Sequence, residues 1–170
     1  MMEGNVVLIG MPGSGKSTIG VVLAKVLGYQ FVDSDLVIQE SQKRLLKDII
    51  TEDGLDGFIR IEEEVNASLD VQNSVIATGG SVIYGKDAMH HLQKIGTVVY
   101  LKLSYESVEE RLGDLNERGV VLRPDQDLYA LYKERCPLYE KYAHITVDCE
   151  ELTIEQSVKK VVNQLEKCIC

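Results

Sequence analysis

The sequence predicts an α/β domain in which helices cover a parallel sheet, and two observations carry this prediction. Short runs rich in Val, Ile and Tyr recur along the chain, at residues 5–9, 30–32, 74–77, 97–103 and 144–147. Segments with helical periodicity separate these runs, and that alternation is typical of parallel strands joined by helices. Because 170 residues can bury one sizeable core, we expect a single domain over residues 1–170.

The first run leads directly into a glycine-rich segment, GMPGSGKST at residues 10–18. It matches the phosphate-loop pattern G-x-x-x-x-G-K-[ST] at Gly10, Gly15, Lys16 and Ser17. Backbone N–H groups and the following helix N-terminus can bind phosphate oxygens, Lys16 can reach the β- and γ-phosphates, and Ser17 can ligate Mg²⁺. An unoccupied glycine-rich turn is the alternative. We expect ATP and Mg²⁺ as cofactors, with the nucleotide bound by Gly13, Ser14, Gly15, Lys16, Ser17 and Thr18.

Two aspartates follow the second run. Residues 16–27 predict a helix that ends at Gly28, and the next strand leads into Asp33 and Asp35. In extended backbone two residues at this spacing face the same way, and they would lie beside the phosphate loop. One carboxylate could help to hold Mg²⁺ while the other accepts the proton of an attacking hydroxyl. Taken alone, the pair also fits a solvated strand end or a helix cap.

The remaining segments predict further helices and a flap. Residues 36–69 have a helical pattern interrupted at Gly54 and Gly57, so we expect two or three short helices that form a substrate-binding subdomain, about residues 35–70. Residues 104–112 and 153–165 each open with Ser or Thr followed closely by Glu, as helices do. The glycines and proline of residues 113–125 indicate a mobile lid.

Three short polar motifs stand out in the rest of the chain. Arg60 and Glu63 are one helical turn apart and can pair, although such a pair can also be a surface feature of little consequence. Arg135 comes just before Cys136-Pro137, where we expect the helix to break. The segment ATGGS at residues 77–81 predicts a sharp turn whose backbone could lie against a ligand.

Composition limits the classes of protein. The 18 basic and 27 acidic residues give a net charge of −9, which disfavours a nucleic-acid partner. The sequence shows no leader-like segment and no apolar stretch of membrane-spanning length, so we expect a cytoplasmic monomer without a membrane partner. It also lacks the N-K-x-D and D-x-x-G elements of GTPases and the LSGGQ stretch of ABC ATPases. A kinase of small molecules remains.

The motifs together resemble the shikimate kinase family. The phosphate loop, Asp33 and Asp35, the R-x-x-E of Arg60 and Glu63, VIATGG, GTVVYL and ERCPLYEKYA follow in that family's order and at about its spacing, over residues 5–165. The resemblance implies a P-loop kinase fold, in which helices flank a five-stranded parallel sheet, with a helical substrate-binding subdomain and a mobile lid. It also implies that ATP phosphorylates the 3-hydroxyl of shikimate, a step of aromatic amino-acid biosynthesis.

The resemblance also assigns roles to residues. Lys16, Asp35 and Arg118 would be catalytic: Asp35 holds the shikimate hydroxyls and helps to remove the proton, and Arg118 reaches the ATP phosphates from the lid. Asp33 and Ser17 would support Mg²⁺, and Arg111 would lie against adenine. The substrate would be bound by Asp35, Arg60, Gly79, Gly80 and Arg135, with the two arginines on its carboxylate.

The sequence departs from the family pattern at two places. Gly79-Gly80 is followed by Ser81, where the family usually has a third glycine, and Arg118 is followed by Gly119-Val-Val where it usually has Pro-Leu-Leu. Two alternatives to a shikimate kinase therefore stay open. One is a P-loop kinase of another small hydroxylated carboxylate, and the other is a nucleotide-binding regulator without transferase activity.

Overall fold

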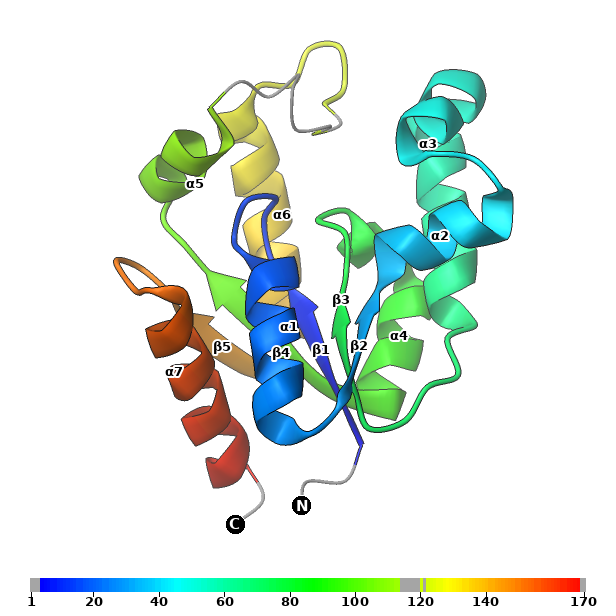
Figure 1. Cartoon of the computed structure of the whole chain (residues 1–170). Helices are drawn as coiled ribbons and strands as arrows, with labels where there is room; N and C mark the ends of the chain where they lie inside the picture. The colour runs from blue at the N-terminus through cyan, green and yellow to red at the C-terminus, as the bar shows by residue number, and fades with distance from the viewer. Residues whose placement is uncertain (1–3, 114–119, 121, 169–170) are drawn as a thin grey trace.

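A parallel sheet of five strands, in the order β2-β3-β1-β4-β5, runs through the centre of the protein (Figure 1). The structure is a computed structural model, and it describes residues 4–113, 120 and 122–168. Its strands are β1 (Asn5–Ile9), β2 (Gln30–Asp33), β3 (Ser74–Ala77), β4 (Gly96–Lys102) and β5 (Ile145–Asp148). Each pair of neighbouring strands is parallel, so the predicted fold class is confirmed.

Helices cover both faces of this sheet. They are α1 (Lys16–Leu27), α2 (Ser34–Gln42), α3 (Leu46–Ala67), α4 (Lys86–Ile95), α5 (Tyr105–Leu112), α6 (Leu128–Tyr142) and α7 (Ile154–Lys167), with one 3₁₀ turn, η1 (Val82–Tyr84). In Figure 1, α1 and α7 lie in front of the strands, whereas α4 and α6 lie behind them. In the part of the chain that the structure describes, no helix is long and apolar enough to cross a membrane.

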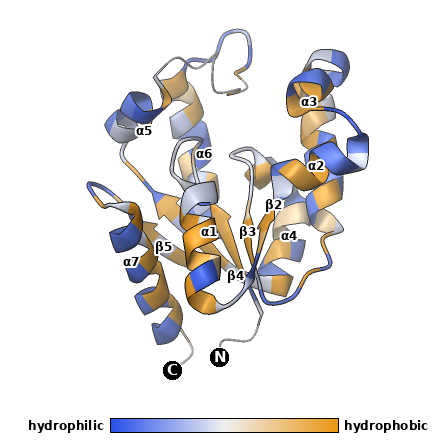
Figure 2. Ribbon diagram, viewed as in Figure 1, coloured by the Kyte–Doolittle hydropathy of each residue, from blue (hydrophilic) through white to orange (hydrophobic). Residues whose placement is uncertain are grey.

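The hydrophobic core follows the strands, and the helices turn their apolar sides towards it (Figure 2). Central strand β1 is buried along its whole length, including the polar Asn5 at its start. The Asn5 amide donates to the carbonyls of Val71 and Ile95, at 2.8 and 3.0 Å, and its oxygen accepts from the Ser74 N–H at 3.0 Å. One side chain thus ties the start of β1 to the chain entering β3 and β4, and the parallel register then places the carboxyl ends of β1 and β3 at one edge.

Helices α2 and α3 stand off the sheet between β2 and β3 (Figure 1), where the sequence predicts a substrate-binding subdomain. They share a small core of their own, made by Ile38, Ile49 and Phe58. The predicted interruption at Gly54 is confirmed, because its φ of 73° and ψ of 177° kink α3 there. The interruption predicted at Gly57 is wrong: this glycine is buried within the helix.

The helix predicted to break before Pro137 continues through it to the end of α6. Proline removes one intrahelical hydrogen bond, which favours a break. Beyond the proline, however, Tyr139 and Tyr142 are buried, and the Tyr139 ring stacks on that of Tyr100 with centroids 5.1 Å apart. The burial of these rings outweighs the lost hydrogen bond, and Arg135 therefore projects from the middle of a helix.

We predict that Asn5→Ala lowers the free energy of unfolding by about 2–4 kcal/mol, because it leaves three backbone groups of the core without their partner. Asn163→Ala, at an exposed position of α7, is the control and should change it by less than about 0.5 kcal/mol. Urea unfolding followed by circular dichroism measures both. Equal midpoints for the two variants would contradict the role given to Asn5.

Candidate active site

The predicted phosphate loop connects β1 to α1 at the carboxyl edge of the sheet. Gly15, with a φ of 88°, precedes the first residue of α1, so the loop turns directly into the helix N-terminus. A cavity of about 250 Å³ opens over this end of the helix. It is lined by Pro12, Gly13, Gly15, Lys16, Ser17, Thr18, Asp35, Thr78, Gly79 and Gly80. A helix N-terminus with a glycine loop around such a cavity can bind phosphate groups.

Lys16 is buried at the start of α1 and closes the loop from within. Its Nζ donates to the carbonyls of Gly10 and Met11, at 2.8 and 2.9 Å. Burial lowers the pKa of Lys16 to about 8, against an upward influence from Asp35. Phosphate oxygens beside Nζ would add negative charge and stabilise the ammonium form.

Asp33 lies beside the phosphate loop and joins it to α2. One carboxylate oxygen accepts from the Ser17 hydroxyl at 3.4 Å, and the other accepts from the Asp35 N–H at 3.0 Å, capping α2. The sequence predicted that the two aspartates lie in one extended segment, and this prediction is wrong. Asp33 ends β2, and Asp35 lies in the first turn of α2.

The oxygen donors of Ser17 and Asp33 fit Mg²⁺, which prefers hard oxygen ligands. Among the described residues, no group of three or more His, Cys, Asp or Glu side chains could hold a metal ion by itself. A magnesium ion at this pair of residues would therefore take further ligands from phosphates and water, as Mg²⁺ commonly does.

A second cavity, of about 480 Å³, adjoins the first. Its wall consists of Pro12, Asp35, Gln39, Leu45, Leu46, Lys47, Ile50, Phe58, Glu62, Gly79, Gly80, Ser81, Val120 and Arg135. Asp35 lies on the wall of both cavities. Burial raises the pKa of its carboxyl group, as does the nearby charge of Asp33, while Lys16 opposes the shift.

Glu62 is the most deeply buried acidic residue of this wall, with 1% of its surface exposed. One carboxyl oxygen accepts from the Ser81 hydroxyl at 2.6 Å, and the other, Oε2, has no hydrogen-bond partner among the described residues. Burial raises the pKa of Glu62 to about 7, and the Ser81 hydrogen bond opposes the rise. Ser81, one of the two departures from the family pattern, therefore faces this carboxyl group.

Gly79 and Gly80 bring bare backbone close to the charged groups of the wall. A Cβ on Gly79 would lie 2.6 Å from Glu62 Oε2 and 3.0 Å from Asp35 Oδ1, and one on Gly80 would lie 2.9 Å from Arg135 Nη1. Any larger side chain would require these groups to move. The two glycines therefore keep the cavity open between the carboxyl groups and the arginine.

Arg135 is buried on this wall, with 4% of its surface exposed, and none of the described ion pairs includes it. Its Nε donates to the Tyr84 hydroxyl at 3.3 Å, and its guanidinium lies 5.4 Å from the centre of the Tyr84 ring. A buried guanidinium without a carboxylate partner favours an anionic ligand, because burying an unpaired charge is costly.

Arg60, predicted as the second arginine of the substrate site, does not join Arg135. Its side chain is exposed on α3, and it is absent from the wall of the cavity. The predicted pairing with Glu63 is wrong as well: Glu63 accepts from the Asp87 N–H at 3.0 Å and caps the start of α4. Arg111, which the resemblance places against adenine, lies next to the phosphate loop. Its Cβ is 3.7 Å from the position that a Cβ on Gly13 would take.

The lid lies largely outside the described residues. Residues 114–119 and 121 are among those that the structure does not describe, and they include Arg118 and Gly119. Val120 is described and lies on the wall of the larger cavity. The expected role of Arg118 therefore stays a prediction.

The phosphate loop lies between a strand and a helix, and a second cavity adjoins the cavity over this loop. The carboxyl group of Asp35 lies on the wall of both cavities. These features define a P-loop kinase of small molecules. A family model described as shikimate kinase matches residues 12–166. The chain belongs to the shikimate kinase family, and it is an ATP-dependent small-molecule kinase.

Individual relatives are similar along almost the whole chain. A shikimate kinase of Thermodesulfovibrio yellowstonii is 36% identical over 96% of this chain and 95% of its own length. The solved shikimate kinase of Acinetobacter baumannii in complex with shikimate is 31% identical, with a TM-score of 0.86 over 96% of this chain and 93% of the other. The crystal structure of the Aquifex aeolicus enzyme is 32% identical, with a TM-score of 0.81 over 95% and 96%.

We predict that Glu62→Gln makes the stability of the ligand-free protein less sensitive to pH. The folded protein holds the Glu62 proton between the ordinary pKa of 4.5 and about 7, whereas the unfolded chain releases it. The wild type therefore loses stability as the pH rises through this window, and the neutral glutamine does not.

The difference in unfolding free energy between Glu62→Gln and the wild type should shift in favour of the variant by up to about 3 kcal/mol from pH 5 to pH 8. Glu64→Gln, at an exposed position of the same helix, is the control and should show no such shift. Chemical unfolding at a series of pH values measures it. A difference that stays constant over this range would show that Glu62 does not titrate there.

Proposed function

We propose that this kinase transfers the γ-phosphoryl group of ATP to the 3-hydroxyl of shikimate. The observation that carries the proposal is the position of Asp35, which lies on the wall of the phosphate cavity and of the larger cavity. A hydroxyl group held at Asp35 would face the end of a triphosphate bound over α1. The membership of the shikimate kinase family supports shikimate as the acceptor.

In the proposed reaction the acceptor hydroxyl oxygen forms a bond to the γ-phosphorus. The bond from that phosphorus to the β–γ bridging oxygen breaks, and ADP leaves. The hydroxyl proton passes to a carboxylate oxygen of Asp35. A carboxyl group with a raised pKa is a stronger base than an ordinary aspartate, which suits this role.

The phosphates would be held by the N–H groups of the loop and by the Lys16 ammonium. Ser17 and Asp33 are proposed to hold Mg²⁺, which would neutralise charge on the β- and γ-phosphates. Arg111 is proposed to lie against adenine, and Arg118 to reach the phosphates from a lid over residues 113–125. The presence of Val120 on the cavity wall supports a lid in this position.

Arg135 supports a carboxylate on the acceptor. Its buried guanidinium can grip a carboxylate through two parallel hydrogen bonds, with Gly79 and Gly80 leaving room for the ring between it and Asp35. The exposed position of Arg60 gives no support to the second arginine of the expected site. We also propose that the protein acts as a monomer in the cytoplasm.

Another hydroxylated carboxylate remains the second candidate, and one observation favours it. The Ser81 hydroxyl donates a hydrogen bond to one carboxyl oxygen of Glu62. Both residues lie on the wall of the larger cavity, which we call the acceptor cavity because the acceptor would bind there. A kinase with a modified wall can prefer a modified ring. A regulator without transferase activity has no such support, since Lys16, Ser17, Asp33 and Asp35 lie together at the phosphate loop.

The test of the proposed function is ADP release, measured in a coupled assay with shikimate and a panel of related hydroxy acids. We expect release that depends on shikimate, with the highest kcat/KM of the panel. A higher value for a different acid would transfer the assignment to that acid. Nucleotide binding without acceptor-dependent release would leave the regulator as the function.

We predict that Asp35→Asn lowers kcat by about 10²–10⁴-fold, the usual contribution of a positioned base, because the amide cannot accept the hydroxyl proton. The affinity for ATP should change by less than about threefold, since the phosphates are held elsewhere. Asp70→Asn, at an exposed position remote from both cavities, is the control. Steady-state kinetics measures kcat, and titration with nucleotide measures the affinity for ATP. A loss of ATP binding with kcat unchanged would refute the role of Asp35.

A further inference from the structure

The acceptor cavity carries a second cation that the sequence motifs do not mark. Among the described residues of its wall, the basic ones are Arg135 from α6 and Lys47 from the first turn of α3. Arg60 also belongs to α3 but is not on the wall. Two cations from separate elements therefore border the space in which the acceptor would bind.

Arg60 lies instead on the outer side of α3, near Asp53. The pKa of the Asp53 carboxyl is lowered, chiefly by hydrogen bonds from Arg44 and in a smaller part by the charge of Arg60. Arg60 thus contributes to the charge balance of the exposed corner formed by α2 and α3. It has no described contact that would bring it to an acceptor.

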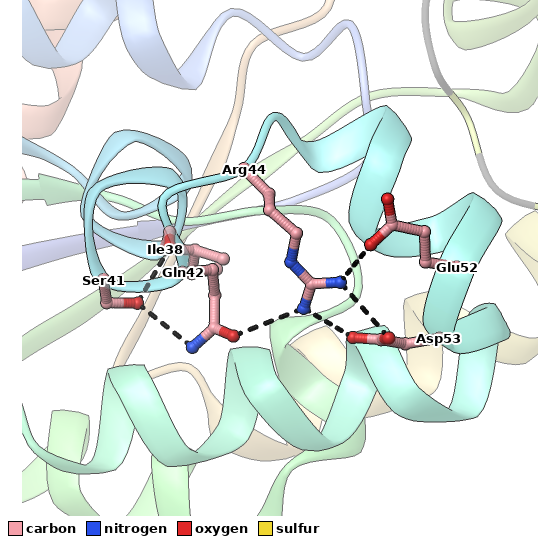
Figure 3. A network of polar contacts seen from close by, with 6 residues as sticks. All are labelled: Ile38, Ser41, Gln42, Arg44, Glu52 and Asp53. Carbon is pink, nitrogen blue, oxygen red and sulfur yellow. Dashed lines mark hydrogen bonds and ion pairs between the residues drawn. The ribbon is translucent and has the colours of Figure 1, made fainter.

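Arg44 is equally unable to serve the cavity, because its guanidinium is already bound. It contacts Glu52 and Asp53 at 2.7 Å each, and its second amino group also donates to Gln42 at 3.5 Å (Figure 3). These contacts join the end of α2 to the second turn of α3. We call this set of four residues the corner clasp.

The corner clasp fixes the backbone from which Lys47 projects. Between its two halves, Lys43 turns the chain with a φ of 54°, and the Leu46 N–H donates to Gln39 Oε1 at 3.1 Å. Leu46 also packs on the small core of α2 and α3. The first turn of α3 is therefore held on both sides, while the Lys47 side chain makes no hydrogen bond or ion pair within the described residues.

We propose that Lys47, and not Arg60, supplies the second positive charge for the acceptor's carboxylate, together with Arg135. The proposal rests on the proposed function, because it assumes an acceptor with a carboxylate. The two cations differ in kind: Arg135 is buried and can bind both carboxylate oxygens, whereas Lys47 is an exposed point charge on a flexible stem. Lys47 therefore attracts and retains the acid, and Arg135 sets its orientation.

This division of roles distinguishes binding from catalysis. Lys47→Gln should raise the KM for shikimate by about threefold to tenfold, because an exposed ion pair contributes modestly. The kcat and the KM for ATP should change by less than about twofold, since Lys47 is not on the wall of the phosphate cavity and no described ion pair joins it to Asp35. Lys47→Arg, which keeps the charge, should restore the KM.

Two matched variants remove a positive charge from the same corner without touching the cavity wall. Arg60→Gln lies on the same helix, and Lys43→Asn lies at the preceding turn, where asparagine tolerates a positive φ. Both should leave the KM for shikimate within about twofold of the wild type. Raising the salt concentration should increase the wild-type KM more than that of Lys47→Gln, because salt screens the exposed charge.

Steady-state kinetics of these four variants and the wild type decide the matter, and a thermal melt of each shows that the fold is kept. An unchanged KM for shikimate in Lys47→Gln, beside normal wild-type turnover, would overturn the role of Lys47 alone. A raised KM in Arg60→Gln would return the role to Arg60. No wild-type turnover with any hydroxy acid would overturn the proposed function and this inference with it.

Discussion

The burial of unpaired charge at one edge of the sheet is the constraint on which the rest of the structure depends. Lys16, Glu62 and Arg135 are buried and Asp35 is half-buried there, and none of the described ion pairs joins them. Such groups are expensive to remove from water, and the pKa of Lys16 is lowered while those of Asp35 and Glu62 are raised by burial. A stable sheet has to carry this cost, and ligands of opposite charge relieve it.

The arrangement of these charges sets the chemistry of both ligands. The cation Lys16 borders the phosphate cavity, Arg135 borders the acceptor cavity, and Asp35 lies on the wall of both. The ATP phosphates would then bind at Lys16 and the acceptor's carboxylate at Arg135. The acceptor's hydroxyl group would lie between them, at the side chain of Asp35. Gly79 is essential to this arrangement, because a Cβ there would fall between Glu62 and Asp35.

Local patterns predicted the fold and the glycine-rich loop that borders a cavity at the carboxyl edge of the sheet, whereas tertiary packing decided the arrangement of the second cavity. Each strand and the phosphate loop consist of consecutive residues, so their local sequence patterns were sufficient to predict them. On α3, by contrast, the motif at Arg60 and Glu63 gave no sign of which side faces the cavity. Glu62 is the residue that faces the cavity, because it lies on the buried side of α3, four residues after Phe58 and four residues before Asn66. The four-residue spacing can be read from the sequence, and the interruption at Gly54 was predicted from it. The corner between α2 and α3, which positions Lys47 on the cavity wall, depends on tertiary contacts that residue spacing does not reveal.

The central claim is that a carboxylate on the acceptor completes the buried charge of the site, and its most direct test compares shikimate with its methyl ester on the wild-type enzyme. The ester keeps the ring and hydroxyl groups but leaves the Arg135 guanidinium without an anionic partner. We predict that kcat/KM for the ester falls by about 10²-fold or more, since each 1.36 kcal/mol of lost transition-state binding is a factor of ten. Comparable kcat/KM values for the acid and the ester would contradict the account.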